Sequence, residues 1–208
     1  LIIHVKILLE FLMIALLTSL FSQENQLILA SESPQRIKIL EMMGVHFQAV
    51  PSNFEEVLDL SLTPEENAQQ LAAGKAGNVF QKFPKSFVVG VDTLVVSAAG
   101  EILGKPENKQ EARVMIAKKS EKKEKIISGI CLMSPNEKII KHEVSEVSFS
   151  ELSEEDVERI VELEEWKGKS GGIAVGGKSG IYIERIAGNF WNIVGFPIPT
   201  FCEMMREV

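Results

Sequence analysis

The sequence predicts an α/β fold in which a mixed central β-sheet is flanked by helices. Short apolar runs of strand length alternate along the chain with amphipathic segments of helix length. Some consecutive strands are separated by a helix, as parallel neighbours must be, and others by a short turn, as antiparallel neighbours often are. With 208 residues, the chain is long enough for one domain, or for two lobes that share a core.

The first half of the chain carries clear start and stop signals. Ser33 is a suitable helix N-cap, Pro34 fits the first helical position and Gly44 ends that helix. Thr63 and Glu66 form a capping box, which marks the start of a second helix. The expected elements in order are a strand over 27–30, a helix over 35–43, a strand over 45–50, a helix from 64 onward, and a strand over 87–91 that continues over 93–97.

The second half continues the mixed pattern. Ala99-Gly100 is a turn that sends the chain back through a short strand, and Ser134-Pro135-Asn136 joins two longer strands. Ser153 caps a helix. The expected elements in order are a strand over 101–103, a helix over 109–118, strands over 126–133 and 139–149, a helix over 154–163, a strand over 181–186 and a helix over 200–206.

Composition excludes several classes of protein. The chain is 45% hydrophobic and 25% charged, as a folded globular protein should be. Its formal net charge of −7 argues against a broad nucleic-acid surface, although a locally basic pocket can still bind a small phosphorylated ligand. Cys131 and Cys202 are far apart and are interpreted as buried thiols. Three scattered histidines give no zinc site; these are His4, His46 and His142.

Residues 1–25 form an apolar extension that precedes the α/β pattern, which occupies 26–208. Lys6 and Glu10 interrupt the apolar residues, and the uninterrupted run over 11–17 is shorter than the ~20 residues of a spanning helix. Three interpretations compete: a signal peptide, a membrane anchor, or an upstream extension created by a mis-assigned start, with Met13 as an internal start. We favour the third, because nothing downstream needs the extra segment.

A first group of candidate site residues lies where the strand over 27–30 meets the following helix. A helix N-terminus presents free N–H groups that can hold an anion. Ser31 and Ser33 add hydroxyl donors there, and Arg36 adds a planar fork suited to phosphate oxygens. The plainer alternative is an ordinary capped helix with a surface arginine.

A second group combines carboxylates and lysines. Asp92 follows an apolar strand and Glu56 belongs to an acidic pair, so the two could hold a divalent cation or activate a water. Lys75 sits among alanines and Lys105 follows a glycine; either could neutralise a leaving pyrophosphate. The plainer alternatives are turn carboxylates and solvated lysines. The Gly-Lys-Ser triplets at 168–170 and 177–179 lack the spacing of a P-loop.

Taken in order, these segments resemble the Maf family of nucleotide pyrophosphatases, and the resemblance extends over residues 27–208. It rests on Leu-Ala-Ser-Glu-Ser-Pro-Gln-Arg at 29–36, Glu56, Leu-Ala-Ala-Gly-Lys-Ala at 71–76, Gly-Val-Asp-Thr at 90–93, Leu-Gly-Lys-Pro at 103–106, Lys-Ser-Gly-Gly at 169–172 and Asn-Ile-Val-Gly-Phe-Pro at 192–197.

The resemblance implies a two-lobed architecture like that of inosine triphosphatases. It also implies a nucleotide diphosphatase that acts on an acid anhydride, converts a nucleoside triphosphate to the monophosphate and pyrophosphate, and clears non-canonical nucleotides. The implied roles are proton acceptor for Asp92, catalytic cations for Lys75 and Lys105, metal ligands for Glu56 and Asp92, substrate binding for Ser31, Ser33 and Arg36, and base specificity for Thr93. The implied cofactor is Mg²⁺ or Mn²⁺. A cytoplasmic location and a homodimer fit this family; a nucleic-acid or membrane partner does not.

The sequence departs from the family pattern at specificity positions. Gln35 replaces the first of two arginines, and Gly176 replaces a glutamine of the thymidine and uridine branch or a glutamate of the methylated-guanosine branch. The family's Ser-Gly-x-Thr-His is replaced by Ser-Glu-Lys-Lys-Glu at 120–124, whereas Thr93 matches the thymidine and uridine branch. These departures leave the base open. They also motivate an alternative, a nucleotide-binding regulator of cell division with weakened catalysis.

Overall fold

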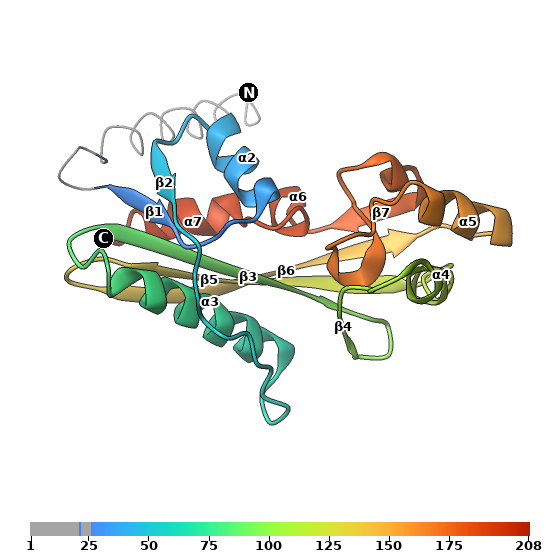
Figure 1. Cartoon of the computed structure of the whole chain (residues 1–208), viewed down its shortest axis with the longest axis horizontal. Helices are drawn as coiled ribbons and strands as arrows, with labels where there is room; N and C mark the ends of the chain where they lie inside the picture. Colours follow the sequence, from blue (N-terminus) through green and yellow to red (C-terminus); the bar gives the residue numbers. More distant parts are fainter. Residues whose placement is uncertain (1–20, 22–25) are drawn as a thin grey trace.

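The structure is a computed structural model that describes residue 21 and residues 26–208 (Figure 1). The predicted extension over 1–25 therefore lies outside the described residues, apart from Phe21. In the part of the chain that is described, one mixed sheet has the strand order β2-β1-β3-β5-β6-β7, with β4 added to β3. This confirms the predicted α/β class. The strands are β1 (Leu27–Leu29), β2 (Phe47–Ala49), β3 (Phe87–Val96), β4 (Ile102–Leu103), β5 (Lys123–Met133), β6 (Lys138–Phe149) and β7 (Ile183–Ala187).

The helices cover the two faces of the sheet unequally. Helix α3 covers one face, while α2, α6, α7 and α5 lie on the other (Figure 1). The helices are α2 (Pro34–Met42), α3 (Pro64–Phe80), α4 (Lys109–Ala117), α5 (Glu154–Glu162), α6 (Phe190–Ile193) and α7 (Ile198–Met204), with 3₁₀ turns η1 (Ser170–Gly172) and η2 (Lys178–Tyr182). Among the described residues, no helix is long and apolar enough to span a membrane.

Strand β3 runs through both halves of the molecule. It pairs in parallel with β1 only as far as Val89, and it pairs with β4 at Val95 and Val96. Between these pairings, one edge of β3 is left open around Asp92. The sequence placed Asp92 at the end of a strand, and this was wrong: it lies within β3, at the point where β1 has already ended. Because alternate residues of a strand face opposite sides, Asp92 faces α3 and Thr93 faces the other side.

The core on the side away from α3 divides into two clusters. One joins β1 and the first part of β3 to α2 and α7, with Phe196 and Phe201 at its centre. The other joins the start of β5 and the end of β6 to α4 and α5 and includes Trp166. Each cluster is the centre of one lobe. Both lobes share the long strands, so their spacing is fixed by the sheet itself.

Helix α3 approaches the opposite face closely because glycines stand under it. A Cβ on Gly129 would lie 2.0 Å from the Ala68 carbonyl oxygen, and one on Gly90 would lie 2.4 Å from the Ala72 carbonyl oxygen. Both obstacles are backbone atoms of a regular helix, which cannot move aside. The glycines therefore set the distance between α3 and the sheet, and with it the height of the α3 side chains over β3.

Local signals predicted the caps better than the boundaries. The Thr63 capping box forms as expected, and Ser153 forms a second one. Ser33 occupies its N-cap position, but its hydroxyl makes no cap hydrogen bond. The predicted strand over 181–186 begins only at 183, after η2, and the last helix begins two residues earlier than expected. Helix α6 was not predicted, since four residues are too few for a helical period to show.

Candidate functional site

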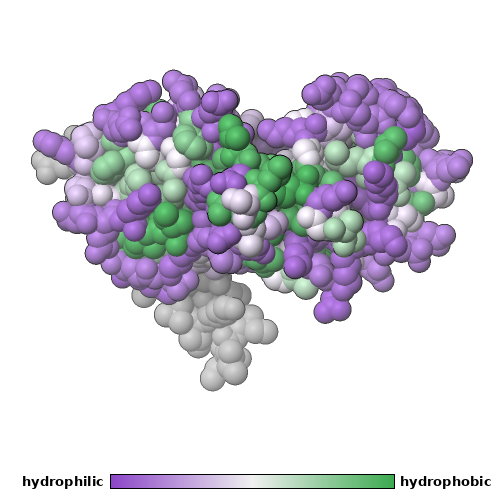
Figure 2. Space-filling model, turned by 90° about the horizontal axis from the view of Figure 1, so that it is seen from below, coloured by the Kyte–Doolittle hydropathy of each residue, from purple (hydrophilic) through white to green (hydrophobic). Residues whose placement is uncertain are grey.

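A cleft of about 1300 Å³ lies between the two lobes. The space-filling view shows the two lobes with an indentation between them and hydrophobic side chains gathered toward the middle (Figure 2). The loop after β1, the N-terminus of α2, the open edge of β3 and the segment after β4 all line it. The segments over 168–177 and 190–195 complete its wall. The cleft thus lies at the carboxyl end of β1, which is where open α/β sheets bind their ligands.

A lysine and two carboxylates meet on one side of the cleft. Lys75 Nζ lies 2.5 Å from Asp92 Oδ1 and 2.8 Å from Glu56 Oε1. Lys75 comes from the middle of α3 and is 7% exposed, and Asp92 is 5% exposed. Glu56 comes from the loop between β2 and α3 and is exposed over about half of its side chain, 54%. Three residues that are far apart in the sequence therefore converge, as the resemblance implied.

The charge of Glu56 is stabilised by its surroundings. Burial raises the pKa of its carboxyl, but the hydrogen bond from Lys75 and the charges of Lys75, Lys105 and Arg36 act in the opposite direction. The balance holds the pKa of Glu56 below its ordinary value. Glu56 is therefore a carboxylate at neutral pH, as a metal ligand must be.

The start of α2 forms the next part of the wall. Arg36 donates from Nε to the Gly195 carbonyl at 3.0 Å and from Nη1 to Ser31 Oγ at 3.3 Å. Ser33 donates its hydroxyl to Gln35 Oε1 at 3.3 Å rather than capping the helix. The N–H groups of the first turn are therefore left for other acceptors, which is the arrangement that binds an anion. Burial lowers the pKa of Arg36, while Asp92 and Glu56 raise it.

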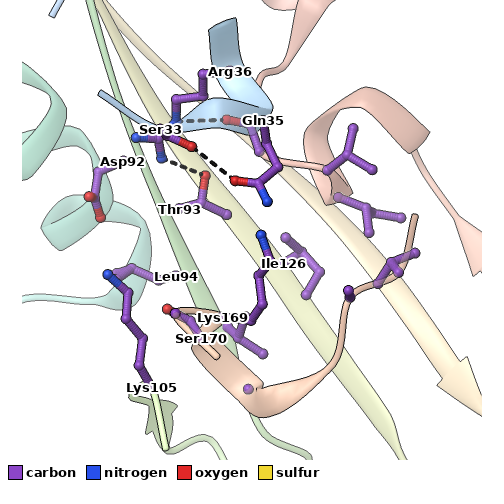
Figure 3. Close-up of a pocket in the computed structure, with 18 of the residues that line it drawn as sticks. Ser33, Gln35, Arg36, Asp92, Thr93, Leu94, Lys105, Ile126, Lys169 and Ser170 are labelled. Carbon is purple, nitrogen blue, oxygen red and sulfur yellow. Dashed lines mark hydrogen bonds between the residues drawn. The ribbon is translucent and has the colours of Figure 1, made fainter. Parts of the chain in front are cut away.

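Thr93 belongs to a chain of hydrogen bonds on the other face of β3. Its hydroxyl oxygen lies 3.4 Å from Arg36 Nη2, which donates to it, and 2.9 Å from the hydroxyl of Ser128 on β5. Ser128 in turn donates to the Asn192 carbonyl at 3.5 Å. Thr93 thus fixes the guanidinium of Arg36 against the sheet (Figure 3).

Two lysines point into the cleft from the second lobe. Lys105, which the sequence predicted, follows β4 and is exposed. Lys169 was not among the predicted site residues, yet its side chain points toward Gln35 (Figure 3). Burial lowers the pKa of Lys169, and the charge of Lys105 lowers it further. The available signal was the Gly-Lys-Ser triplet at 168–170, which is not a P-loop but does bring a lysine to the cleft.

Gly176 also lines the cleft, on the loop before η2. A Cβ added there would lie 3.5 Å from Val194 Cγ1, which is ordinary contact, so the position has room for a side chain. The loop is held from beneath by Glu165, whose carboxylate accepts from the N–H groups of Lys178 and Ser179 at 2.9 and 3.0 Å. The absence of a side chain at 176 therefore widens an otherwise fixed wall.

The donor set fits a hard divalent cation that shares its ligands with a substrate. No group of three or more His, Cys, Asp or Glu residues within residues 26–208 could hold a metal by itself. Mg²⁺ is commonly bound by one or two carboxylates together with substrate phosphates and water. Glu56 and Asp92 supply two carboxylates that approach the same lysine nitrogen, which is the number such a site needs.

Comparison with known proteins points to one family. A model of the family described as Maf-like protein matches residues 26–208. A dTTP/UTP pyrophosphatase of Caldicellulosiruptor bescii is 41% identical, over 88% of this chain and 95% of its own. A dTTP/UTP pyrophosphatase of Bacillus pumilus is 36% identical over 88% and 96%, and one of Pyrococcus abyssi is 38% identical over 86% and 95%.

Proposed function

Because this chain belongs to the Maf-like protein family, we propose that it is a nucleoside triphosphate pyrophosphatase that acts on dTTP and UTP. The convergence of Lys75, Asp92 and Glu56 beside the uncapped N-terminus of α2 supports this proposal most directly. A carboxylate pair, a helix N-terminus and several cations are what hydrolysis of a phosphoanhydride requires.

The residues act on two groups, the attacking water and the leaving pyrophosphate. Glu56 and Asp92 would hold Mg²⁺ or Mn²⁺, which would supply positive charge to neutralise the phosphate oxygens. Asp92 accepts a proton from the water that attacks the α-phosphorus, and the ion pair with Lys75 holds its carboxylate in place. The bond from the α-phosphorus to the bridging oxygen breaks, and pyrophosphate departs with that oxygen. Lys105 and Arg36 stabilise the charge on the departing group.

The preference for dTTP and UTP is supported by the named relatives and by Thr93. Because Gly176 has no side chain, it cannot make the contact with the base that a longer residue at that position could make. Loss of a hydrogen bond to a base can change discrimination by orders of magnitude, so we expect the ranking of substrates to differ from that of the relatives. A nucleotide substrate also fits a cytoplasmic enzyme.

The test is release of pyrophosphate by the full chain from a panel of nucleoside triphosphates with Mg²⁺. Asp92→Asn should reduce kcat about 10²- to 10⁴-fold, the usual contribution of a general base. Asp156→Asn, in a capping box on the far lobe, is the matched control and should leave kcat unchanged. Folded protein that releases no pyrophosphate from any substrate would refute the proposal.

A second candidate is a nucleotide-binding regulator with weakened catalysis. Gln35 favours it, because an exposed amide now occupies the helix N-terminus where the family pattern has an arginine. Tight binding of a nucleoside triphosphate without detectable turnover would support this alternative. The retained Glu56 and Asp92 argue against it, since binding alone does not require both carboxylates.

A further inference from the structure

The guanidinium of Arg36 belongs to a closed ring of hydrogen bonds. Arg36 Nη2 donates to Thr93 Oγ1 at 3.4 Å (Figure 3), and that oxygen lies 2.9 Å from Ser128 Oγ. Ser128 Oγ donates to the Asn192 carbonyl at 3.5 Å, and the same carbonyl accepts from the Gly195 N–H at 3.0 Å. The ring closes where the Gly195 carbonyl accepts from Arg36 Nε at 3.0 Å. Ser128 contributes a side chain to this ring but has no role in the proposed chemistry.

The chemistry of the members fixes the direction of the bonds. An arginine side chain can only donate, and a carbonyl oxygen can only accept. Ser128 has one hydroxyl proton, which is directed at the Asn192 carbonyl, so the proton between the two hydroxyl groups belongs to Thr93. Thr93 therefore donates to Ser128 while its oxygen accepts from Arg36. Without the oxygen of Ser128, nothing in the ring would hold the Thr93 hydroxyl in the rotamer that accepts from Arg36.

The ring is attached to rigid parts of the sheet. Thr93 and Ser128 are directly opposite each other in the antiparallel pair of β3 and β5. Asn192 is 0% exposed, and its Nδ2 donates at 3.0 Å to both the Ile126 carbonyl on β5 and Ser145 Oγ on β6. These two bonds hold α6 against the sheet, which matters because a helix of four residues has little stability of its own. The carbonyl that accepts from Ser128 therefore has a fixed position.

Gly195 completes the ring on the side of α6. Its backbone has φ of 106°, a conformation that residues with a side chain rarely adopt. Its N–H bonds to Asn192 and its carbonyl accepts from Arg36, so the position of α6 determines where that carbonyl lies. Arg36 is thus held from two directions, by the hydroxyl groups on the sheet and by the backbone that follows α6.

The ring leaves a defined part of Arg36 for a ligand. A guanidinium carries five N–H groups in total. Three of them donate to Gly195, Ser31 and Thr93, so two remain, one on each terminal nitrogen. Because Arg36 lines the cleft, these two groups are the donors that phosphate oxygens can reach. Their direction depends on the bonds that hold the rest of the guanidinium.

We propose that Ser128 is a positioning residue, which acts through Thr93 to hold the guanidinium of Arg36 in the orientation that binds the phosphates of the substrate. Ser128 is 0% exposed and does not line the cleft, so it does not touch the substrate itself. This inference rests on the proposed function and adds a residue that supports its phosphate site. A Ser128 that only linked β3 to β5 would stabilise the sheet, but its effect would not depend on Arg36.

The experiment is a double-mutant cycle between Ser128→Ala and Arg36→Lys. Alanine removes only the hydroxyl oxygen, and lysine keeps the positive charge of Arg36 but lacks the planar fork. The matched control is Ser148→Ala, at a buried serine of β6 that lies outside the ring. For each full-length protein, kcat/KM for dTTP is measured with Mg²⁺, binding of inorganic tripolyphosphate is measured by calorimetry, and folding is checked by thermal unfolding.

Ser128→Ala should lower kcat/KM and weaken tripolyphosphate binding about 2- to 10-fold, which is what one neutral hydrogen bond contributes. It should have no further effect in the Arg36→Lys background, because the residue through which it acts is then absent. The control should match the parent in both measurements. No loss in Ser128→Ala, or an equal loss with and without Arg36, would overturn the inference. If the parent binds tripolyphosphate with this coupling but releases no pyrophosphate, the proposed function fails while the positioning role stands.

Discussion

Replacement of Lys75 by methionine tests the electrostatics of the site most directly. Methionine keeps the unbranched shape of the side chain and removes its charge. The ammonium lies 2.5 Å from Asp92 and 2.8 Å from Glu56, and the side chains of Lys75 and Asp92 are only 9% and 7% exposed. The substitution therefore leaves the carboxylate of Asp92 buried without its partner, while Glu56 remains hydrated.

The expected loss of stability differs for the two carboxylates. Removing one partner of a buried pair costs about 3–5 kcal/mol, whereas a pair with an exposed member contributes about 0–1 kcal/mol. In a protein of this size, 1 kcal/mol changes Tm by about 2–4 °C. Lys75→Met should therefore lower Tm by about 6–20 °C, and Glu56→Gln by at most about 4 °C.

The assay is thermal unfolding in a chelating buffer, with a double-mutant cycle. The double variant Lys75→Met with Asp92→Asn should recover part of the loss, because it buries no uncompensated charge. Both Lys75→Met and Glu56→Gln should lose pyrophosphatase activity, although only the first loses much stability. A Tm for Lys75→Met within about 2 °C of the parent would refute the reasoning, because the carboxylate of Asp92 would then not depend on the lysine.

Three further predictions concern packing, pH and specificity. Gly129→Ala should cost about 2–3 kcal/mol in urea unfolding, because its Cβ would lie 2.0 Å from the backbone oxygen of Ala68. The pKa of Glu56 is lowered in the folded state, so its charge contributes stability above about pH 4.5, its ordinary pKa. This contribution should disappear as the pH falls through the lower folded-state pKa. Glu56→Gln should therefore flatten this part of the plot of Tm against pH. Gly176→Gln should fold normally, since the added Cβ would lie at ordinary contact distance from Val194, and Tm should change by no more than about 2 °C. The variant should change the ratio of kcat/KM for UTP to that for CTP.

Local chemistry explains which parts of the fold could be predicted from the sequence. The capping boxes at Thr63 and Ser153 involve residues three apart, so the signal and the structure that it specifies occupy the same short segment. The glycine after α2 adopts the left-handed conformation that its position suggested, with φ of 68°. Alternation of strands and helices was enough to indicate the mixed sheet.

Features that depend on distant contacts could not be predicted. The sequence suggested that a strand ends at Asp92, but β5 pairs with β3 on both sides of that residue and keeps it extended. Ser33 is a residue type that often caps helices, yet its hydroxyl donates a hydrogen bond to the side chain of Gln35 instead. The shortening of the strand at 181–182 follows from η2, which Glu165 anchors from another segment.

The site shows the same division between local and distant information. Lys75, Asp92 and Glu56 are far apart in the sequence. The residue types suggested that Glu56 and Asp92 could share a cation, and the convergence of all three was expected through the family resemblance. Lys119 and Glu124 lie five positions apart in a charged segment, and nothing in their spacing indicates that they are buried. Only the packing of α4 and β5 shows that both are buried and that they line the cleft.

Strand β3 explains why chemistry and specificity can change separately in this protein. Asp92 and Thr93 are consecutive, so their side chains face opposite sides of the sheet. The proposed proton acceptor therefore belongs to the α3 side, whereas Thr93 belongs to the other side. The departure at Gly176 concerns the wall of the cleft, and the residues around Asp92 match the family pattern. Substitutions at Gly176 should consequently alter KM and the choice of base, while kcat for an accepted nucleotide should depend on Asp92 and its neighbours.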